Sequence, residues 1–235
     1  MTVAIVIIIF SIVQSIFGVG LLLFGTPTLL LLGFGFEQSL WMLLPSSVAI
    51  SSYQIVGKHS LIKSKKEIYQ YTLPLLIIGI VVVITNSNVI DIEKIVGLFL
   101  FMIGGIRLFK KFRILLKRFI RRRVKIYCVI MGAVHGISNM GGGMLTVLMS
   151  STHARKEVIQ VNIAYVYLLF GLTQIIVLSI ISDNHFSYYA LMLITLSSLA
   201  YYLTTKYLMH FIDNAKYQLF ITYLVLAYGA MALIH

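Results

Sequence analysis

Long apolar segments separated by short basic connections constrain this chain more than any other feature of its sequence. Six continuous segments lie at roughly 38–57, 70–90, 92–109, 158–181, 186–205 and 217–234. A helix needs about 20 predominantly apolar residues to cross the hydrocarbon core of a bilayer. Only 11% of the 235 residues are charged, whereas soluble domains carry about a quarter. The pattern predicts an all-α, polytopic integral membrane protein.

Two further apolar stretches, 2–33 and 126–150, are interrupted by glycine. The first contains Phe17-Gly18-Val19-Gly20 and then Gly25-Thr26-Pro27, and the second contains Asn139-Met140-Gly141-Gly142-Gly143-Met144. Such breaks uncover backbone polar groups that a lipid-facing segment cannot tolerate, so each must be buried in protein or line a cavity. Each stretch is therefore a broken helix or a re-entrant hairpin, and the chain has about eight membrane segments in all.

The two broken stretches resemble each other. One shift of 116 residues aligns three features of the two halves: Gly20 and Gly25 with Gly136 and Gly141, Ser46 with Asn162, and segment 70–90 with segment 186–205. We therefore predict an internal duplication, with repeats over 1–109 and 125–235. The alternative is a chance match, because a glycine-rich membrane chain aligns with itself at some offset.

The lysines and arginines favour one of two topologies. If each broken stretch crosses the membrane once, the connections 58–66 and 107–125 place 14 of the 19 basic residues on one side. If each stretch is a hairpin that returns to its starting side, 18 of the 19 collect there and only Lys94 lies opposite. Cytoplasmic loops carry an excess of Lys and Arg, so the second arrangement fits better. It also inverts the two halves, a recurrent transporter design.

The connection 110–124 joins the predicted repeats and carries much of the net charge of +12. Its apolar residues fall on one helical face, with cations around the rest: Phe112, Leu115, Leu116 and Phe119. This pattern is typical of an interfacial helix held by anionic lipid headgroups; a regulatory binding segment is the alternative. Because the positive charges lie in connections between apolar segments, as orientation signals do, we expect no nucleic-acid partner.

No charged side chain lies in the middle of a predicted span. All seven Asp and Glu residues map to segment ends or connections. Cation pathways and proton relays usually need carboxylates inside the membrane. A bound anion would have to be held by neutral donors.

Glycine-opened helix starts supply such donors, because backbone N–H groups at a helix N-terminus bind anions. The run from Asn139 to Gly143 has this form, and Gly25 with Thr26, followed by Pro27 in a first helical turn, is its predicted counterpart. With the polar steps of the next helices, the candidate substrate-binding residues are Gly25, Thr26, Ser46, Ser47, His135, Asn139, Gly141, Gly142, Gly143 and Asn162.

Each candidate has a structural alternative. Ser46, Ser47 and Asn162 are also suited to interhelical hydrogen bonds, and the glycines to close helix packing. His135 is open to three roles: contact with an anion, proton transfer near neutral pH, or a satisfied core histidine. Gln14 and Gln160 either line the same cavity or cap loose backbone.

No enzyme motif is present. The sequence contains no metal-ligand spacing or nucleophile elbow, and Gly141-Gly142-Gly143 lacks the Lys and Ser/Thr that follow a phosphate-binding loop. We expect no catalytic activity, metal or cofactor.

The chain resembles the TauE/SafE family of sulfite exporter-like membrane permeases. The resemblance rests on two similar halves, on the glycine clusters Gly18-Val19-Gly20 and Gly141-Gly142-Gly143, and on the small polar steps Pro45-Ser46-Ser47 and Val161-Asn162. It implies export of small sulfur-containing anions, such as sulfite or organosulfonates, across the cytoplasmic membrane. The first half departs from the family pattern, because Leu23-Phe24-Gly25-Thr26 replaces a triple glycine.

These observations favour a secondary transporter of small anions that works by alternating access of its two halves. The alternative is a non-transporting membrane scaffold that binds another protein through the basic 107–125 region. Substrate identity, coupling ion and direction stay open, as does assembly into a homo-oligomer.

Overall fold

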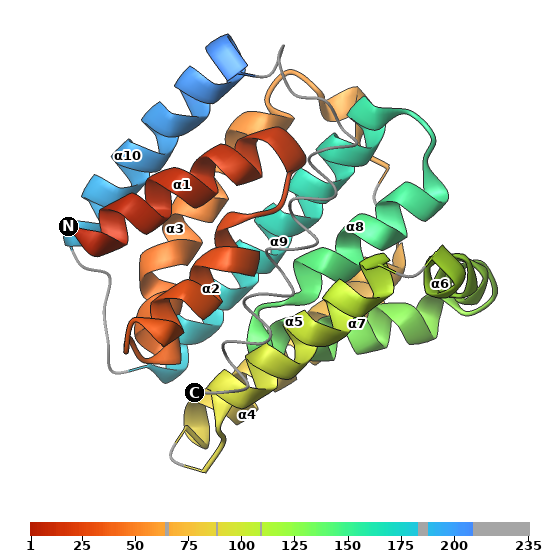
Figure 1. The fold of residues 1–235 in the computed structure, drawn as a ribbon, viewed down its shortest axis with the longest axis horizontal. Helices are drawn as coiled ribbons and strands as arrows, with labels where there is room; N and C mark the ends of the chain where they lie inside the picture. The colour runs from red at the N-terminus through yellow and green to blue at the C-terminus, as the bar shows by residue number, and fades with distance from the viewer. Residues whose placement is uncertain (64–65, 88, 109, 183–187, 209–235) are drawn as a thin grey trace.

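The computed structural model describes residues 1–63, 66–87, 89–108, 110–182 and 188–208. Within these ranges the chain is entirely helical (Figure 1). The elements are α1 (Thr2–Phe17), α2 (Leu21–Leu31), α3 (Phe36–Ile55), η1 (His59–Leu61), η2 (Ile68–Thr72), α4 (Leu73–Thr85), α5 (Ile92–Leu108), α6 (Lys110–Arg122), α7 (Val124–Ser138), α8 (Gly141–Thr152), α9 (Lys156–Ile181), α10 (Tyr188–Leu203) and η3 (Thr204–Leu208).

Five of the six continuous apolar segments coincide with helices. They are α3, the joined η2 and α4, α5, α9, and α10; the sixth, 217–234, lies outside the described residues. By length and hydropathy, two helices in the described part can cross a membrane, Ile68–Thr85 and Lys156–Ile181. Helices α1, α2 and α7 are apolar but shorter.

Both predicted breaks are present, and both reverse the chain. Helix α1 ends at Gly18 (φ 76°) and α7 ends at Asn139 (φ 62°), each in the left-handed conformation. The capping N–H donates to the carbonyl four residues earlier, Gln14 in one case and His135 in the other, at 2.8 Å. In Figure 1, α2 then returns beside α1, and α8 turns back from α7. We call the two units hairpin 1 (α1–α2) and hairpin 2 (α7–α8).

The helix ends recur at a different spacing from the one that the glycines suggested. Gly18 and Asn139 are 121 positions apart, and α3 and α9 begin 120 apart (36 and 156). The 116-residue shift is therefore wrong as a structural register. Its error is about one helical turn, because it matched Gly20 of a turn with Gly136, which lies inside α7 and packs against α4.

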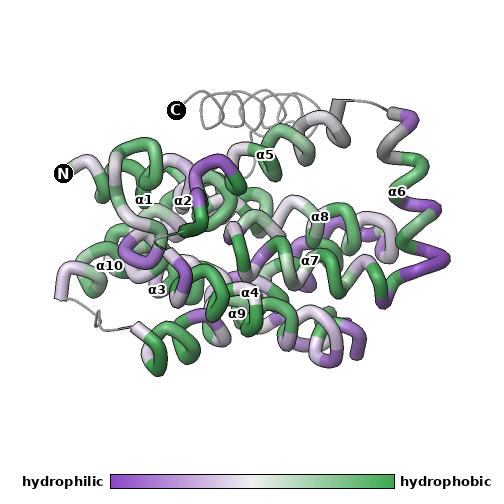
Figure 2. The backbone as a smooth tube through the Cα atoms, turned by 90° about the horizontal axis from the view of Figure 1, so that it is seen from below, coloured by the Kyte–Doolittle hydropathy of each residue, from purple (hydrophilic) through white to green (hydrophobic). Residues whose placement is uncertain are grey.

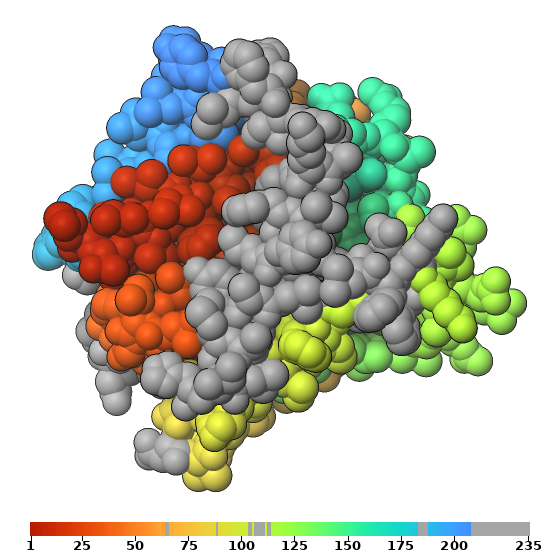
Figure 3. Space-filling model, in the orientation of Figure 1, coloured from red at the N-terminus to blue at the C-terminus, as the bar shows by residue number. Residues whose placement is uncertain are grey.

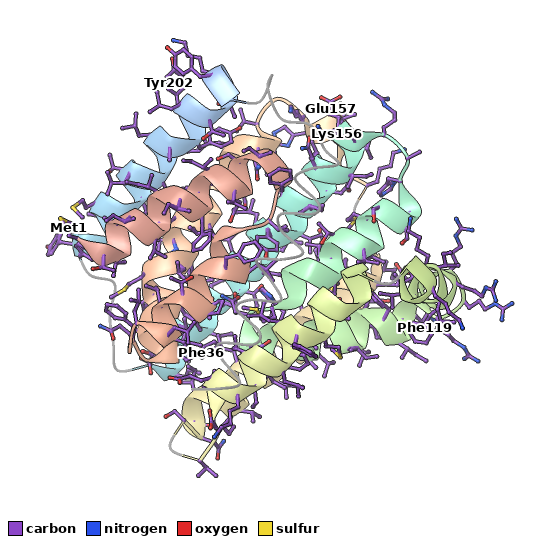
Figure 4. All side chains as sticks on the ribbon, viewed as in Figure 1. Met1, Phe36, Phe119, Lys156, Glu157 and Tyr202 are labelled. Atoms are coloured by element: carbon purple, nitrogen blue, oxygen red, sulfur yellow. The ribbon has the colours of Figure 1, made fainter. Side chains whose placement is uncertain are left out.

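The two halves pack into one another. Helix α3 lies antiparallel to α9: Trp41 Nε1 donates to Ser182 Oγ (3.3 Å) at one end, and Lys58 lies 3.9 Å from Glu157 at the other. Figure 4 shows Glu157 and Lys156 where α9 begins. Helix α1 lies beside α10, and Figure 3 shows the two helices together on one face of the molecule. Hairpin 1 and hairpin 2 are thus held in a common bundle.

Glycines allow α7 to lie directly against η2 and α4. A Cβ added at Gly132 would overlap the carbonyl of Thr72, and one added at Gly136 would overlap the carbonyl of Leu76. These glycines are packing residues, one of the alternatives the sequence left open. They fix the first arm of hairpin 2 against η2 and α4.

Besides the apolar core, the described helices bury polar side chains and expose several large apolar ones. On α9, Ile176 and Ile180 are 60% and 77% exposed, whereas Gln174 is fully buried. Figure 2 shows hydrophobic residues along most of the helices. Since soluble proteins rarely expose apolar patches of this extent, the surface suits contact with lipid.

Helix α6 confirms the helix predicted over the basic connection. Figure 2 shows it running across the ends of neighbouring helices. Ile120 is buried and Leu116 packs on the core, while Leu115 and Phe119 are exposed. The residues of the predicted apolar face therefore point in two directions: Leu116 packs on the protein, whereas Leu115 and Phe119 lie on the surface. Basic side chains extend from the same surface (Figure 4).

Candidate functional site

The N-terminus of α8, at the tip of hairpin 2, is buried and uncapped. Helix α8 begins with Gly141, Gly142 and Gly143, all buried, and the side chain of its N-cap residue, Met140, does not cap it. Only the preceding N–H, of Met140, has a side-chain acceptor, Ser138 Oγ at 3.3 Å. The first N–H groups of a helix have no partner within the helix, so within the described part of the chain this tip presents N–H donors without an acceptor.

Helix α9 directs polar and aromatic side chains at this tip. Tyr167, Phe170 and Gln174 follow helical spacing and share one face. The Tyr167 hydroxyl lies so close to Gly142 that a Cβ added there would overlap it. The ring centroids of Phe170 and His135 are 4.4 Å apart. The absence of side chains on the glycines is thus what lets the tyrosine reach the helix start.

His135 lies on the other side of the same glycines. A Cβ added at Gly141 would be 2.5 Å from His135 Cβ and 3.0 Å from its Nδ1. The rings of His135 and Tyr167 have centroids 6.2 Å apart. The histidine and the tyrosine therefore flank the start of α8.

A buried chain of hydrogen bonds joins the tip to two other helices. Asn139 Nδ2 donates to Thr26 Oγ1 of α2 (2.9 Å), and Gln174 Nε2 donates to Asn139 Oδ1 (3.4 Å). All three side chains are fully buried. The loop conformation helps to make this possible, because asparagine tolerates the left-handed region at which α7 ends. The tip of hairpin 2 is tied to hairpin 1 through Thr26.

Several polar atoms around the tip lack a partner among the described residues. They are both ring nitrogens of His135, the Tyr167 hydroxyl and Gln174 Oε1. The His135 ring and the Gln174 side chain lie near each other and interact weakly, whereas the Tyr167 hydroxyl has no such neighbour among the described residues. Nearly all buried polar groups in proteins are hydrogen-bonded, and each one left unpaired costs about 1–3 kcal/mol. A concentration of such atoms around an uncapped helix start points to a ligand.

The site has no formal charge other than any that His135 gains. No Asp, Glu, Lys or Arg is among the buried residues of the described part, and no group of metal-ligating side chains occurs there. The helix dipole contributes a partial positive charge of about half a unit at the start of α8. Electrostatically, this end of the helix suits a small anion.

The tip of hairpin 1 is built differently, because side chains of α1, α3 and α9 form hydrogen bonds with its backbone. Gln14 Oε1 accepts from the N–H of Leu21, the first residue of α2, at 3.3 Å. Gln54 donates to the carbonyls of Gln14 (2.9 Å) and Ser15 (3.2 Å), and Gln160 donates to that of Ile16 (2.8 Å). Of the two roles the sequence left open for Gln14 and Gln160, the structure shows backbone capping.

The structure brings together six of the ten residues predicted from the sequence: Thr26, His135, Asn139, Gly141, Gly142 and Gly143. Ser47 instead serves hairpin 1, where its carbonyl and hydroxyl bond the Gln14 amide at 3.2 Å. Asn162 bonds the backbone of Leu61 and Lys63, so it holds the connection after α3. Ser46 is buried in α3 with its hydroxyl unpaired among the described residues.

Gly25 is not at a helix start. Helix α2 begins at Leu21, and Pro27, expected in a first turn, lies inside it. A Cβ added at Gly25 would be 2.7 Å from Leu43 Cδ2, so this glycine permits close contact between α2 and α3. The prediction that Gly25 opens a half-helix is therefore wrong: Gly-Thr-Pro resembles a helix start locally, but the turn at Gly18 precedes it.

Sequence reasoning did not identify Tyr167, Phe170 or Gln174 as residues of the site. Tyrosines and phenylalanines are scattered along the chain, 14 of each, so neither carried a signal. Gln174 did carry one, since it is a polar residue within the longest apolar helix.

A family model for the sulfite exporter TauE/SafE matches residues 3–232 of the chain. Comparisons with curated proteins and with solved structures gave no match.

Proposed function

The chain belongs to the sulfite exporter TauE/SafE family of membrane transporters, and from this we propose that it carries a small anion bound at the tip of hairpin 2. The proposed substrates are sulfur-containing oxyanions such as sulfite and organosulfonates. The proposed location is the cytoplasmic membrane, which the chain crosses several times.

One observation carries the proposal: the uncapped start of α8 is buried beside the unpaired Tyr167 hydroxyl. A helix N-terminus is a ready anion site, because its N–H groups and dipole both favour negative charge. The tyrosine hydroxyl and a ring N–H of His135 add donors from two further directions. An oxyanion has several acceptor atoms, so it matches donors that converge in this way.

The described site is closed to solvent. His135, Asn139 and Tyr167 are each fully buried, so an anion enters only if the packing around the tip opens. We propose that opening separates the tip of hairpin 2 from α2, which breaks the contact between Asn139 and Thr26. Alternating exposure of one site by two moving halves is the expected mechanism for a repeat-built transporter.

We propose that the halves are inverted repeats. The near-constant spacing of the helix ends supports this, and so does the antiparallel packing of α3 on α9, which hold corresponding places in the two halves. In this arrangement both hairpins re-enter the membrane without crossing it, and the basic connections lie on the cytoplasmic side.

We propose that α6 lies in the cytoplasmic membrane interface and binds anionic headgroups. Its exposed apolar residues, Ile114, Leu115 and Phe119, lie among basic side chains, a combination typical of interfacial helices. Its orientation across the helix ends in Figure 2 is compatible with this position.

Sulfite efflux from proteoliposomes tests the transport proposal. Gly142→Ala should abolish efflux, because its Cβ would displace the Tyr167 hydroxyl from the start of α8. Gly105→Ala is the control, since a Cβ there meets no described atom within 4 Å. Wild-type protein that moves neither sulfite nor sulfonates would contradict the proposal. If the protein is instead a scaffold that acts through residues 107–125, Gly142→Ala should leave its binding to the partner protein unchanged.

A further inference from the structure

Gln14 and His135 hold the same place in the two hairpins. Each lies four residues before the left-handed residue that ends its helix, and the carbonyl of each accepts the N–H of that residue at 2.8 Å. A glycine follows six residues later and packs on each of them: Gly20 against Gln14, and Gly141 against His135. The first helical N–H beyond that glycine belongs to Leu21 in hairpin 1 and to Gly142 in hairpin 2.

The side chain of Gln14 is an internal ligand of α2. Its Oε1 accepts from Leu21 N (3.3 Å), while its Nε2 donates to the carbonyl of Ser47 (3.2 Å) and to Ser51 Oγ (3.2 Å). The backbone partners fix the orientation of the amide, because an N–H can only donate and a carbonyl can only accept. Gln14 is fully buried, so its oxygen permanently occupies the start of α2.

The side chain of His135 does the opposite. It is fully buried beside Gly141. The side chain of Gln174 lies close to its ring, but no N–H group of α8 donates to either ring nitrogen. The short, rigid imidazole packs on Phe170 and leaves the N–H groups of α8 without an acceptor. At equivalent positions, one hairpin carries its own acceptor and the other lacks one.

We propose that Gln14 fills the anion position of hairpin 1, so that each chain binds one anion and not two, and that histidine at 135 is what keeps the position in hairpin 2 free. This inference rests on the proposed function. It makes Gln14 a positioning residue that locks one hairpin, and it predicts that glutamine at 135 would cap α8 and compete with the substrate.

Isothermal titration of the purified full-length protein in nanodiscs with sulfite tests the inference. Wild type should bind one sulfite per chain. His135→Gln should weaken binding by roughly tenfold or more, because an internal acceptor replaces the bonds that the anion would make, and its melting temperature should equal or exceed that of wild type. His135→Ala is the matched control: it removes the imidazole but supplies no acceptor, so it should retain more affinity than His135→Gln.

Gln14→Ala provides the reciprocal measurement. Removal of the internal acceptor should give a second binding event in protein that stays folded. If this variant does not fold, the comparison of His135→Gln with His135→Ala decides alone. Two sulfites bound per wild-type chain, equal affinities of the two His135 variants, or a folded Gln14→Ala with a single site would overturn the inference. Wild type that binds no anion at all would instead overturn the proposed function.

Discussion

The hydroxyl of Tyr167 lies against Gly142, at the spot where any other residue would place its Cβ. Tyr167 comes from the middle of α9 and Gly142 from the start of α8, so the contact joins a long helix to the tip of a hairpin. The hydroxyl has no hydrogen-bond partner among the described residues. A hydroxyl placed in this way adds no hydrogen bond to the described fold, which agrees with its proposed role as a donor to a bound anion.

The first prediction concerns this hydroxyl. Tyr167→Phe should leave thermal stability unchanged or slightly raised, because it removes a buried polar atom that has no partner. Sulfite affinity should fall by about tenfold, the value of one hydrogen bond to a charged group. A melting curve and a titration measure the two effects separately.

Tyr127→Phe is the matched control. Its hydroxyl is also in the protein interior but donates to the carbonyl of Met144 at 2.7 Å. This variant should lose about 1 kcal/mol of stability. A Tyr167→Phe protein that is destabilised as much as Tyr127→Phe would show that the Tyr167 hydroxyl has a structural partner.

The second prediction concerns the link between the hairpins. Asn139→Gly removes the amide but keeps a residue suited to the left-handed region, whereas Asn139→Ala adds backbone strain. The stability loss of the double variant Thr26→Val/Asn139→Gly should be smaller than the sum of the losses in the two single variants. The difference, which is the coupling energy, should be about 0.6–1.7 kcal/mol, as for a hydrogen bond between membrane helices. Additive effects on the melting temperature would mean that the contact contributes no stability in the membrane.

The third prediction separates packing glycines from site glycines. Gly136→Ala should cost about 1–3 kcal/mol, because its Cβ meets backbone atoms of α4 that cannot move independently. Gly35→Ala should be tolerated, since a Cβ there has no neighbour within 4 Å in the described part of the protein. The readout is thermal stability in detergent. Equal melting temperatures for the two variants would contradict the close approach of α7 to α4.

The fourth prediction concerns α6. Replacing Lys117, Arg118, Arg121 and Arg122 together by Gln should reduce the extra stability that anionic lipid gives over neutral lipid. Each basic residue near an anionic surface contributes about 1 kcal/mol. Melting temperatures in nanodiscs of the two lipid types measure the difference. A lipid dependence identical to that of wild type would place α6 away from the headgroups.

The parts of the fold that could be predicted are those with a local signal. Apolar length indicated the helices, and the run from Asn139 to Gly143 indicated the break that opens α8. The basic residues of 110–124 indicated a helix distinct from the spans. In each case the residue types alone constrain the backbone.

The rest depended on contacts between distant segments. The predicted 116-residue offset between the two halves depended on Gly136. This residue looks like a turn glycine in the sequence but packs against α4. Ser47 and Asn162 are polar residues in apolar helices, and only the structure shows that their partners are Gln14 and the connection after α3. Tyr167 could not be distinguished from the other tyrosines without the position of Gly142.

An anion bound at the start of α8 would contact backbone N–H groups of glycine, and glycine amides can be observed directly. In protein labelled selectively at glycine, a sulfite titration followed by NMR should shift the amide resonances of Gly141, Gly142 and Gly143 in a saturable manner, while those of Gly18 and Gly20 in hairpin 1 stay in place. Saturable shifts confined to hairpin 1, or none at any glycine under conditions where sulfite is transported, would contradict the account.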